Sequence, residues 1–174
     1  MVPDRPTTAR TETDEVVALG RLQARYADVV SRRAWSELAE LFLPDTTVDI
    51  DTVTGPPRSI TGPEAFGTFV AASMERFDHF TFVILNAVVE IDPGSDGGVG
   101  DTASGRIFMC EVRHDRATDT WQNAHGLYQD RYRAVDGHWR FVHRRYRSLA
   151  RTGPEAAVLG LPAGLGPLGR PIPS

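Results

Sequence analysis

Four side chains could bind a small molecule or move a proton: Tyr26, His79, Arg113 and Tyr128. A histidine changes its charge near neutral pH and can act as a general base or acid. Phenolic hydroxyls and an arginine can stabilise an enolate or a carboxylate. These residues lie far apart in the sequence, so this chemistry requires a fold that brings a helix and several strands around one pocket.

The 19 Lys and Arg residues are all arginine. Schiff-base catalysis, a pyridoxal-phosphate anchor and a P-loop lysine are therefore excluded. Cys110 is the single cysteine, which excludes an intramolecular disulfide and a cysteine-rich zinc site and suits a reducing compartment. No group of histidines and carboxylates has metal-ligand spacing, and no glycine-rich loop links a strand to a helix. We therefore expect no metal and no cofactor.

The chain has 174 residues and a formal net charge of −4. This length suits one domain with one hydrophobic core. An acidic protein does not attract phosphate backbones, so we expect no nucleic acid partner. The N-terminus lacks an apolar signal region, and no apolar run is long enough to cross a bilayer. We expect a cytoplasmic protein with no membrane partner.

Hydrophobic periodicity predicts helices in the first part of the chain and strands in the second. Thr13 opens a helix whose apolar residues recur every three or four positions, and this face includes Tyr26. A short helix over 35–42 and a longer one from Thr61, with Phe66 on its apolar stripe, follow. Apolar runs, alternating or continuous, predict strands over 46–53, 79–92, 101–114, 121–135 and 138–149. The predicted class is α+β.

The two ends of the chain differ in composition from the middle. We expect residues 1–12 to be disordered and residues 13–151 to form the domain. From Gly153 onward glycine and proline recur about every second residue, which neither a helix nor a strand tolerates. Residues 152–174 are therefore either a disordered tail or, because they contain several leucines, a lid over the pocket.

Three segments resemble the SnoaL-like branch of the NTF2-like superfamily, and the resemblance covers residues 13–151. The segments are RYADVVSRRAW at 25–35, ITGPEAF at 60–66 and LYQDRYRAVDGHWRF at 127–141. The resemblance implies a cone-shaped NTF2-like fold, with three N-terminal helices packed in a curved antiparallel sheet. It also implies an apolar cavity at the open end, a small hydrophobic ligand in that cavity, and a homodimer formed through the outer face of the sheet.

The resemblance implies a catalytic role for Tyr26. Dehydratase-like members of the family have a tyrosine on the first helix and, five residues later, an aspartate that supports a catalytic histidine. The fifth residue here is Ser31, whose hydroxyl can bind substrate but cannot stabilise an imidazolium as a carboxylate does. Asp28 does not replace that aspartate, because two residues along a helix point it away from the side of Tyr26.

The family's histidine lies near the start of the strand after the third helix, four residues before an asparagine or a small residue. Counting back from Asn86 gives Phe82, and the nearest histidine, His79, lies three residues earlier. Positions 79 and 82 of a regular strand point to opposite faces. His79 is thus either a general base that reaches the pocket through a bulge or a histidine at the helix-to-strand corner.

Two strand positions match substrate-contacting positions of the scytalone dehydratase members. These positions are Gly126 and Tyr128, and Tyr128 could hold a carbonyl oxygen, or it could be a core aromatic residue. Arg113 falls where those members have a second histidine. It could bind an anionic group, or it could form a solvent-facing ion pair with Glu111.

The last strand is locally basic, with Arg140, Arg144, Arg145, Arg147 and Arg151. Such a run could bind the phosphates of a coenzyme A thioester. A solvated face or an ion-pair network at a dimer interface is the simpler interpretation.

These observations favour a cofactor-free lyase, isomerase or cyclase that acts on a small hydrophobic, oxygenated molecule of the polyketide or steroid kind. His79 would remove a proton while Tyr26 and Tyr128 hold the developing enolate. The expected substrate-binding residues are Ser31, Phe66, Phe82, Asn86, Arg113 and Tyr128. A protein that binds without catalysis is an alternative, which the serine and the displaced histidine favour. A structural small subunit of a dioxygenase-like complex is another, because such subunits share this fold and size.

Overall fold

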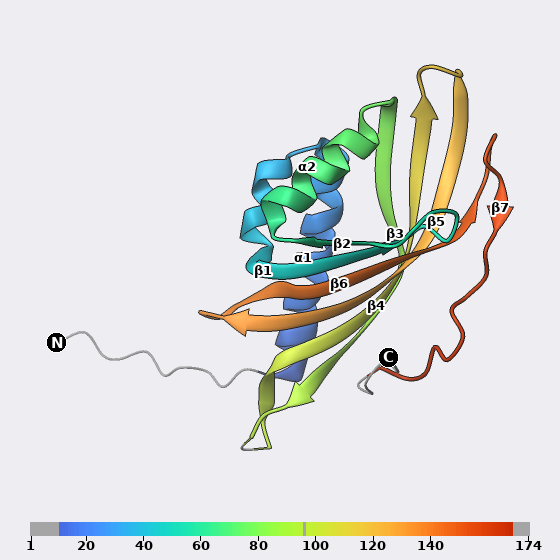
Figure 1. Cartoon of the computed structure of the whole chain (residues 1–174). Coiled ribbons are helices and arrows are strands. Elements are labelled where there is room, and N and C mark those ends of the chain that lie inside the picture. The colour runs from blue at the N-terminus through green and yellow to red at the C-terminus, as the bar shows by residue number, and fades with distance from the viewer. Residues whose placement is uncertain (1–10, 96, 169–174) are drawn as a thin grey trace.

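The computed structural model describes residues 11–95 and 97–168. Most of the segment 1–12, which we expected to be disordered, lies outside the described residues, and so does the end of the tail. Helices come first and a long curved sheet follows, so the predicted α+β class is confirmed. Figure 1 shows that the sheet bends around the first helix, which lies on its inner side.

Helix α1 (Glu12–Arg32) forms because both of its ends are capped and one of its faces is apolar. The side-chain oxygen of Thr11 accepts a hydrogen bond from the Asp14 backbone N–H at 3.2 Å, so the helix begins before Thr13. At the other end Arg33 has a left-handed conformation, and its N–H binds carbonyls of the last turn. The buried residues of α1 include Leu19, Leu22, Gln23, Tyr26, Val29 and Val30.

The second and third helical segments are short. The second is a 3₁₀-helix, η1 (Trp35–Glu40), and after Leu41 a strand begins at Phe42, earlier than the sequence predicts. The third is α2 (Pro63–Met74), which begins with a proline in its first turn, where the missing N–H costs nothing. Helix α2 packs against η1 and turns Phe66 toward the interior.

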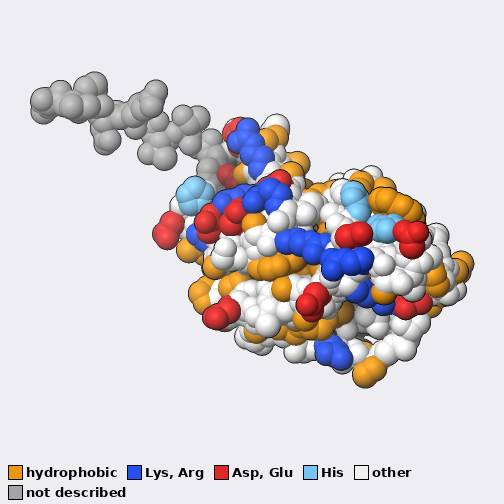
Figure 2. Space-filling view, turned by 90° about the horizontal axis from the view of Figure 1, so that it is seen from above, with side chains coloured by type: hydrophobic (Ala, Val, Ile, Leu, Met, Phe, Trp, Pro, Cys, Tyr) orange, Lys and Arg blue, Asp and Glu red, His pale blue; other side chains and the backbone are white. Residues whose placement is uncertain are grey.

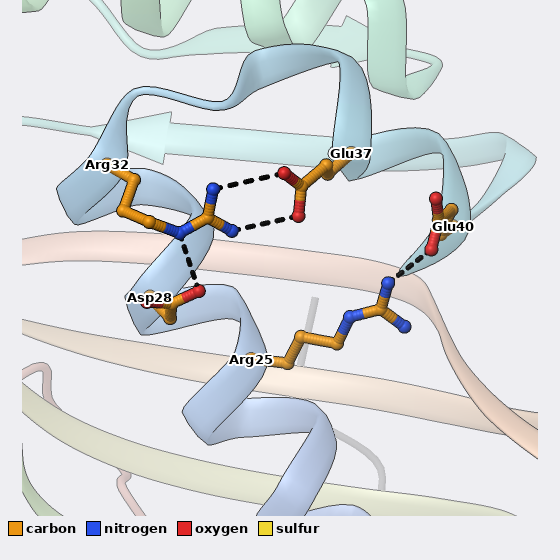
Figure 3. Close-up of polar contacts among 5 residues, drawn as sticks. All are labelled: Arg25, Asp28, Arg32, Glu37 and Glu40. Carbon is orange, nitrogen blue, oxygen red and sulfur yellow. Dashed lines mark hydrogen bonds and ion pairs between the residues drawn. The ribbon is translucent and has the colours of Figure 1, made fainter.

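Ion pairs on the outer side of the helical layer connect α1 to η1 (Figure 3). Arg32 contacts Asp28 at 2.8 Å and Glu37 at 2.9 Å. Arg25 contacts Glu40 in the same region. These side chains are solvent-exposed, so the pairs orient η1 rather than stabilise the core.

The sheet is built from seven strands in the described part of the chain, in the order β2-β1-β6-β5-β4-β3 with β7 beside β6. Their bounds are β1 (Phe42–Asp51), β2 (Arg58–Thr61), β3 (Phe77–Pro93), β4 (Val99–Asp115), β5 (Thr120–Val135), β6 (His138–Arg151) and β7 (Ala157–Val158). Strands β1 and β6 are parallel, and the other described pairs are antiparallel. The expectation of an antiparallel sheet is therefore corrected at one position, because β1, besides its antiparallel pairing with β2, pairs in parallel with the last long strand, β6.

Bulges decide which side chains face the interior. In β6 the register passes from Phe141 opposite Tyr132 to His143 opposite Arg131, so one extra residue lies between them. Because a bulge changes the alternation of faces, Phe141 and Arg144 are both fully buried. Strand β3 has a similar shift between Phe77 and His79.

Beyond β7 the tail follows the outer face of the sheet, on the side away from the helices (Figure 1). The Leu149 carbonyl accepts hydrogen bonds from the N–H groups of Leu159 and Gly160, at 2.8 and 3.2 Å. Residues 162–165 border a depression on the outer face beside Arg145. Leu161 is 60% exposed and Leu165 borders that depression, so neither of these two leucines covers the interior. No helix within the described residues has the length and hydropathy of a membrane span.

Candidate functional site

A cavity of about 350 Å³ lies between the helices and the inner face of the sheet. Helix α1 contributes Tyr26 to its lining, α2 contributes Phe66, β4 contributes Arg113 and β5 contributes Tyr128. Four of the predicted site residues are thus brought together. This volume fits a small organic molecule.

Tyr26 lies at the centre of an aromatic cluster. Its ring packs edge-on against Phe82, Tyr128 and Phe141, with centroids 5.5 to 6.2 Å apart. Its position follows from the apolar face of α1, which places it against the sheet. The side chain is 2% exposed, so its hydroxyl needs a partner inside the protein.

Tyr128 is the neighbouring phenol, and its ring centroid lies 6.2 Å from that of Tyr26. Burial, and next the neighbouring Tyr26, raise the pKa of Tyr128 well above its ordinary value. Burial also raises the pKa of Tyr146, whose ring centroid lies 5.3 Å from that of Tyr128. Tyr26, Tyr128 and Tyr146 all line the cavity. Because their pKa values are raised, Tyr128 and Tyr146 are neutral hydrogen-bond donors at neutral pH.

Gly126 makes room for the third phenol. A Cβ atom at this position would lie 2.3 Å from Cε2 of Tyr146 and 2.9 Å from the sulfur of Met109. The absence of a side chain lets the Tyr146 ring cross the face of β5 and reach the cavity. Gly126 matches a substrate-contacting position because its lack of a side chain lets the Tyr146 ring reach the cavity.

Glu111 and Arg113 form an ion pair in the cavity lining. They are two residues apart on β4, so they share the inner face of the sheet. Glu111 is 8% exposed, and burial lowers the pKa of Arg113. The pair that we considered as a solvent-facing alternative does form, but it faces the cavity.

A second buried ion pair supports the cavity from behind. Arg144 donates hydrogen bonds to both oxygens of Asp130, each at 2.8 Å, and to Gln23 at 3.3 Å. Its guanidinium carbon lies 4.1 Å from the ring centroids of both Tyr26 and Tyr128. Burial alone would lower the pKa of Arg144, but Asp130 outweighs burial and holds this pKa above its ordinary value.

Sequence reasoning missed this network, because it treated Arg144 as part of a solvated or interfacial arginine run. The bulge in β6 reverses the faces that simple alternation predicts, so no period in the sequence marks Arg144 as buried. Asp130 was the available signal. It shares the inner face of β5 with Tyr128, and a buried aspartate requires a cation.

His79 does not reach the cavity, so its predicted role as the general base is corrected. It is exposed, its Nε2 lies 3.1 Å from the Thr81 hydroxyl, and its ring lies 5.0 Å from that of Trp121 on the outer face. The register shift lies before His79, so Phe80 and Phe82 point inward while His79 points outward. Histidine at this position is a surface residue.

Asn86 is also corrected as a binding residue. It is exposed on β3, directly after a second register shift between Ile84 and Asn86. The side chain does not line the cavity.

Ser31 has a structural contact in place of the predicted substrate contact. Its hydroxyl oxygen accepts a hydrogen bond from the Phe82 backbone N–H at 3.0 Å. Strand β3 is at the edge of the sheet, and the serine satisfies an amide on its open side. Neither Ser31 nor Phe82 lines the cavity, although Phe82 packs against Tyr26 behind it. Asp28, the other nearby candidate, is paired with Arg32 on the outside of α1 (Figure 3).

Within the described residues, no group of three His, Cys, Asp or Glu side chains could hold a metal ion. Cys110 is buried and lies 4.0 Å from His125, and burial raises the pKa of its thiol. A thiol in this state is a poor nucleophile.

Solved structures with similar folds include several proteins of bacterial origin. The putative scytalone dehydratase of Novosphingobium aromaticivorans is 21% identical, with a TM-score of 0.64 over 91% of this chain and 95% of its own. The hexachlorocyclohexane dehydrochlorinase LinA-type3 of Novosphingobium barchaimii is 18% identical, with a TM-score of 0.67 over 86% and 97%. An NTF2-like protein of N. aromaticivorans with a cystatin-like fold is 20% identical, with a TM-score of 0.63 over 79% and 83%. No curated protein matches the sequence.

These similarities establish the fold, which is the cone-shaped NTF2-like fold that the sequence motifs predicted. At the level of sequence, residues 11–145 match the family described as the SnoaL-like domain. That match covers most of the chain and includes α1 with Tyr26, α2, the Glu111–Arg113 pair on β4, and Tyr128 on β5. The chain belongs to the SnoaL-like domain family of the NTF2-like superfamily.

Proposed function

We propose that the protein is a cofactor-free isomerase or lyase that removes a proton from carbon next to a carbonyl group in a small hydrophobic molecule. One observation carries the proposal: the buried carboxylate of Glu111 and the buried phenol of Tyr128 face the same cavity. A carboxylate base and hydrogen-bond donors at the carbonyl oxygen are sufficient for enolisation without a metal. The base differs from the histidine that the sequence suggested.

In this mechanism the Glu111 carboxylate accepts the proton from carbon, and the electron pair of the C–H bond moves onto the carbonyl oxygen as an enolate. Tyr128 and Tyr146 donate hydrogen bonds to that oxygen, because their raised pKa values keep them protonated. Return of the proton to another carbon completes an isomerisation. In an elimination, the carbonyl group re-forms, the carbon–carbon electron pair of the enolate makes a double bond to the next carbon, and the leaving group departs from that carbon with the electrons of its own bond.

The comparisons support the elimination branch, because two of the similar structures are named as a dehydratase and a dehydrochlorinase. The aromatic lining and the volume of about 350 Å³ suit a compact ring system of the polyketide or steroid kind.

The test is mass spectrometry of a pooled metabolite extract incubated with the purified protein in D₂O. Turnover should give a metabolite that loses a leaving group or gains deuterium. Glu111→Gln should lower the rate by at least about 100-fold, and Tyr128→Phe by about 100-fold. Glu64→Gln is the matched control, because Glu64 is exposed on α2 and does not line the cavity. Full turnover by Glu111→Gln would exclude Glu111 as the base.

A binding protein without catalysis is the second candidate, and the outward position of His79 favours it. The cavity then lacks the histidine that other members of the family use. In that case a compound would co-purify with the protein, survive incubation unchanged, and be lost from a Tyr128→Phe variant.

We also propose the homodimer that the resemblance implies. Three apolar residues of β3, Val83, Leu85 and Val88, are 37 to 57% exposed on the sheet, and a second copy would cover them. Sedimentation should show a dimer for the wild type and a monomer for Leu85→Glu, with Leu161→Glu in the tail as the control. A chain that is monomeric without a second protein would instead favour the dioxygenase-like subunit.

A further inference from the structure

The opening of the cavity has an unusual set of charged residues. Arg76 lies in the turn between α2 and β3, Arg151 is the last residue of β6, and Glu155 lies in the turn after β6. All three line the cavity. Arg76 and Glu155 have side chains 48% and 54% exposed, whereas Tyr128 is buried. The three charged residues therefore surround the mouth, and the phenols form the interior.

A carboxylate from the tail lies between the two arginines. One oxygen of Glu155 is 3.8 Å from Nη2 of Arg76, and the other is 3.5 Å from Nη1 of Arg151. Arg76 is held in place from its other side, because its Nε lies 3.3 Å from the buried carboxylate of Asp115. Its guanidinium also lies 4.8 Å from the ring centroid of Phe77. Arg76 is thus oriented by the core, and Glu155 is the member of the group that belongs to the tail.

The contacts of Glu155 are weak enough to be exchanged. Charge-assisted hydrogen bonds are normally about 2.7–2.9 Å long, so distances of 3.5 and 3.8 Å are long. Ion pairs this exposed contribute little to stability. The turn that carries Glu155 joins β6 to the two-residue strand β7, and the Ala156 N–H is bound to the Gly153 carbonyl at 3.1 Å.

The charges at the mouth indicate which kind of ligand group could take the position of the Glu155 carboxylate. Arg76 and Arg151 face Asp115 and Glu155, so the group is neutral as long as one carboxylate occupies the position of Glu155. A ligand carboxylate preserves that balance, whereas a neutral ligand that displaces Glu155 leaves a cation without its counter-charge. In Figure 2, which views the molecule from the end where α2 meets β3, arginine and acidic side chains lie side by side among hydrophobic ones.

We propose that the mouth is an anion subsite, so that the ligand is a hydrophobic acid whose ring system lies among the phenols and whose carboxylate replaces Glu155 between Arg76 and Arg151. The inference rests on the proposed small-molecule site and not on its chemistry. The Glu155 carboxylate occupies the position that the ligand's anionic group would take, and it competes with that group for the same arginines.

The test uses two fluorescent probes that differ in one anionic group: 1-anilinonaphthalene-8-sulfonate and the neutral N-phenyl-1-naphthylamine. Glu155→Gln should bind the sulfonate about two- to five-fold more tightly, and Arg151→Gln about two- to five-fold more weakly, as expected for exposed ion pairs. Neither change should affect the neutral probe. Arg145→Gln is the matched control, because Arg145 is exposed on the same strand at the outer face.

A further variant locates the probes. Val70 lines the cavity, and Val70→Trp should release both probes by filling it. Sulfonate binding that survives Val70→Trp, or that is unaffected by Glu155→Gln and Arg151→Gln, would overturn the subsite. The result is independent of catalysis, since Glu111→Gln can abolish turnover and leave the preference of the mouth for the sulfonate unchanged.

Discussion

The guanidinium carbon of Arg144 lies 4.1 Å from the ring centroid of Tyr128, in the fully buried interior of the protein. The cation lies against two phenols that line the cavity, Tyr26 and Tyr128, and Asp130 holds it in that position. The orientation of Tyr26 and Tyr128 therefore depends on an ion pair that makes no contact with the cavity itself.

Removal of one charge from this pair should be severely destabilising. Asp130→Asn leaves the Arg144 cation buried without its counter-charge, which should lower the free energy of unfolding by about 3–5 kcal/mol. Urea denaturation measures this loss. Asp136→Asn, in the exposed turn between β5 and β6, is the control and should change little. A loss below about 1 kcal/mol for Asp130→Asn would show that the pair is not a structural support.

A methyl group at Gly126 should disturb the cavity more than the fold. Gly126→Ala places a Cβ within 2.3 Å of the Tyr146 ring, so the ring must move and stability should fall by about 1–3 kcal/mol. Thermal unfolding and probe titration would measure both effects. Gly126→Ala should cost less stability in a Tyr146→Ala background than in the wild type. An equal cost in both backgrounds would mean that the clash is with Met109 or the backbone instead.

Loss of the Ser31 hydroxyl should affect stability and not binding. Ser31→Ala leaves the Phe82 amide without its acceptor, and one hydrogen bond of this kind is worth about 1 kcal/mol. The affinity of ligands for the cavity should stay at the wild-type value. Thr68→Ala, on the exposed side of α2, serves as the control. Weaker ligand binding by Ser31→Ala would instead show that Ser31 is part of the ligand-binding site.

His114 should make stability depend on pH. Its Nδ1 lies 2.7 Å from Asp78 and its Nε2 lies 3.2 Å from Asp119, and the hydrogen bond with Asp78 is the main reason that its pKa is raised. A pKa that is raised in the folded state stabilises the protein below the unfolded value of about 6.5, and this contribution is lost as the pH rises through the folded pKa.

Urea denaturation across that pH range should therefore show a decline for the wild type and a flatter profile for His114→Gln. Asp78→Asn should also flatten the profile, because it removes the main cause of the shift. His138→Gln is the control, since His138 is the exposed first residue of β6. An unchanged decline in His114→Gln would assign the pH dependence to another group.

The fold could be predicted because its signals are local and repeated. The apolar stripe of α1 and the alternation of the long strands require neighbours that cover them, and the turn residues between the strands give the order of the hairpins. The partners of β1 could not be predicted, because nothing in its own sequence distinguishes a parallel neighbour from an antiparallel one.

The site could be predicted only in part, because the positions of some of its residues depend on how the strands are assembled into the sheet. Tyr26, Phe66 and Tyr128 lie where uninterrupted periodicity puts them, and Arg113 shares a regular stretch of β4 with Glu111. The positions of His79, Asn86 and Arg144 depend on register shifts, and a shift of one residue exchanges the faces of a strand. Ser31 depends on the open edge of β3, which is a property of the assembled sheet.

The parallel pairing of β1 with β6 determines when the domain can fold during synthesis. Val48 pairs with Arg144, so β1, which is synthesised early, cannot complete its pairing until β6 has been synthesised. Until β6 has left the ribosome, the aromatic residues of β1 and α1 lack the strand that covers them, and they are available to chaperones or to aggregation. A chain that ends before residue 138 should gain no native structure, whereas one that ends after residue 160 contains every described strand.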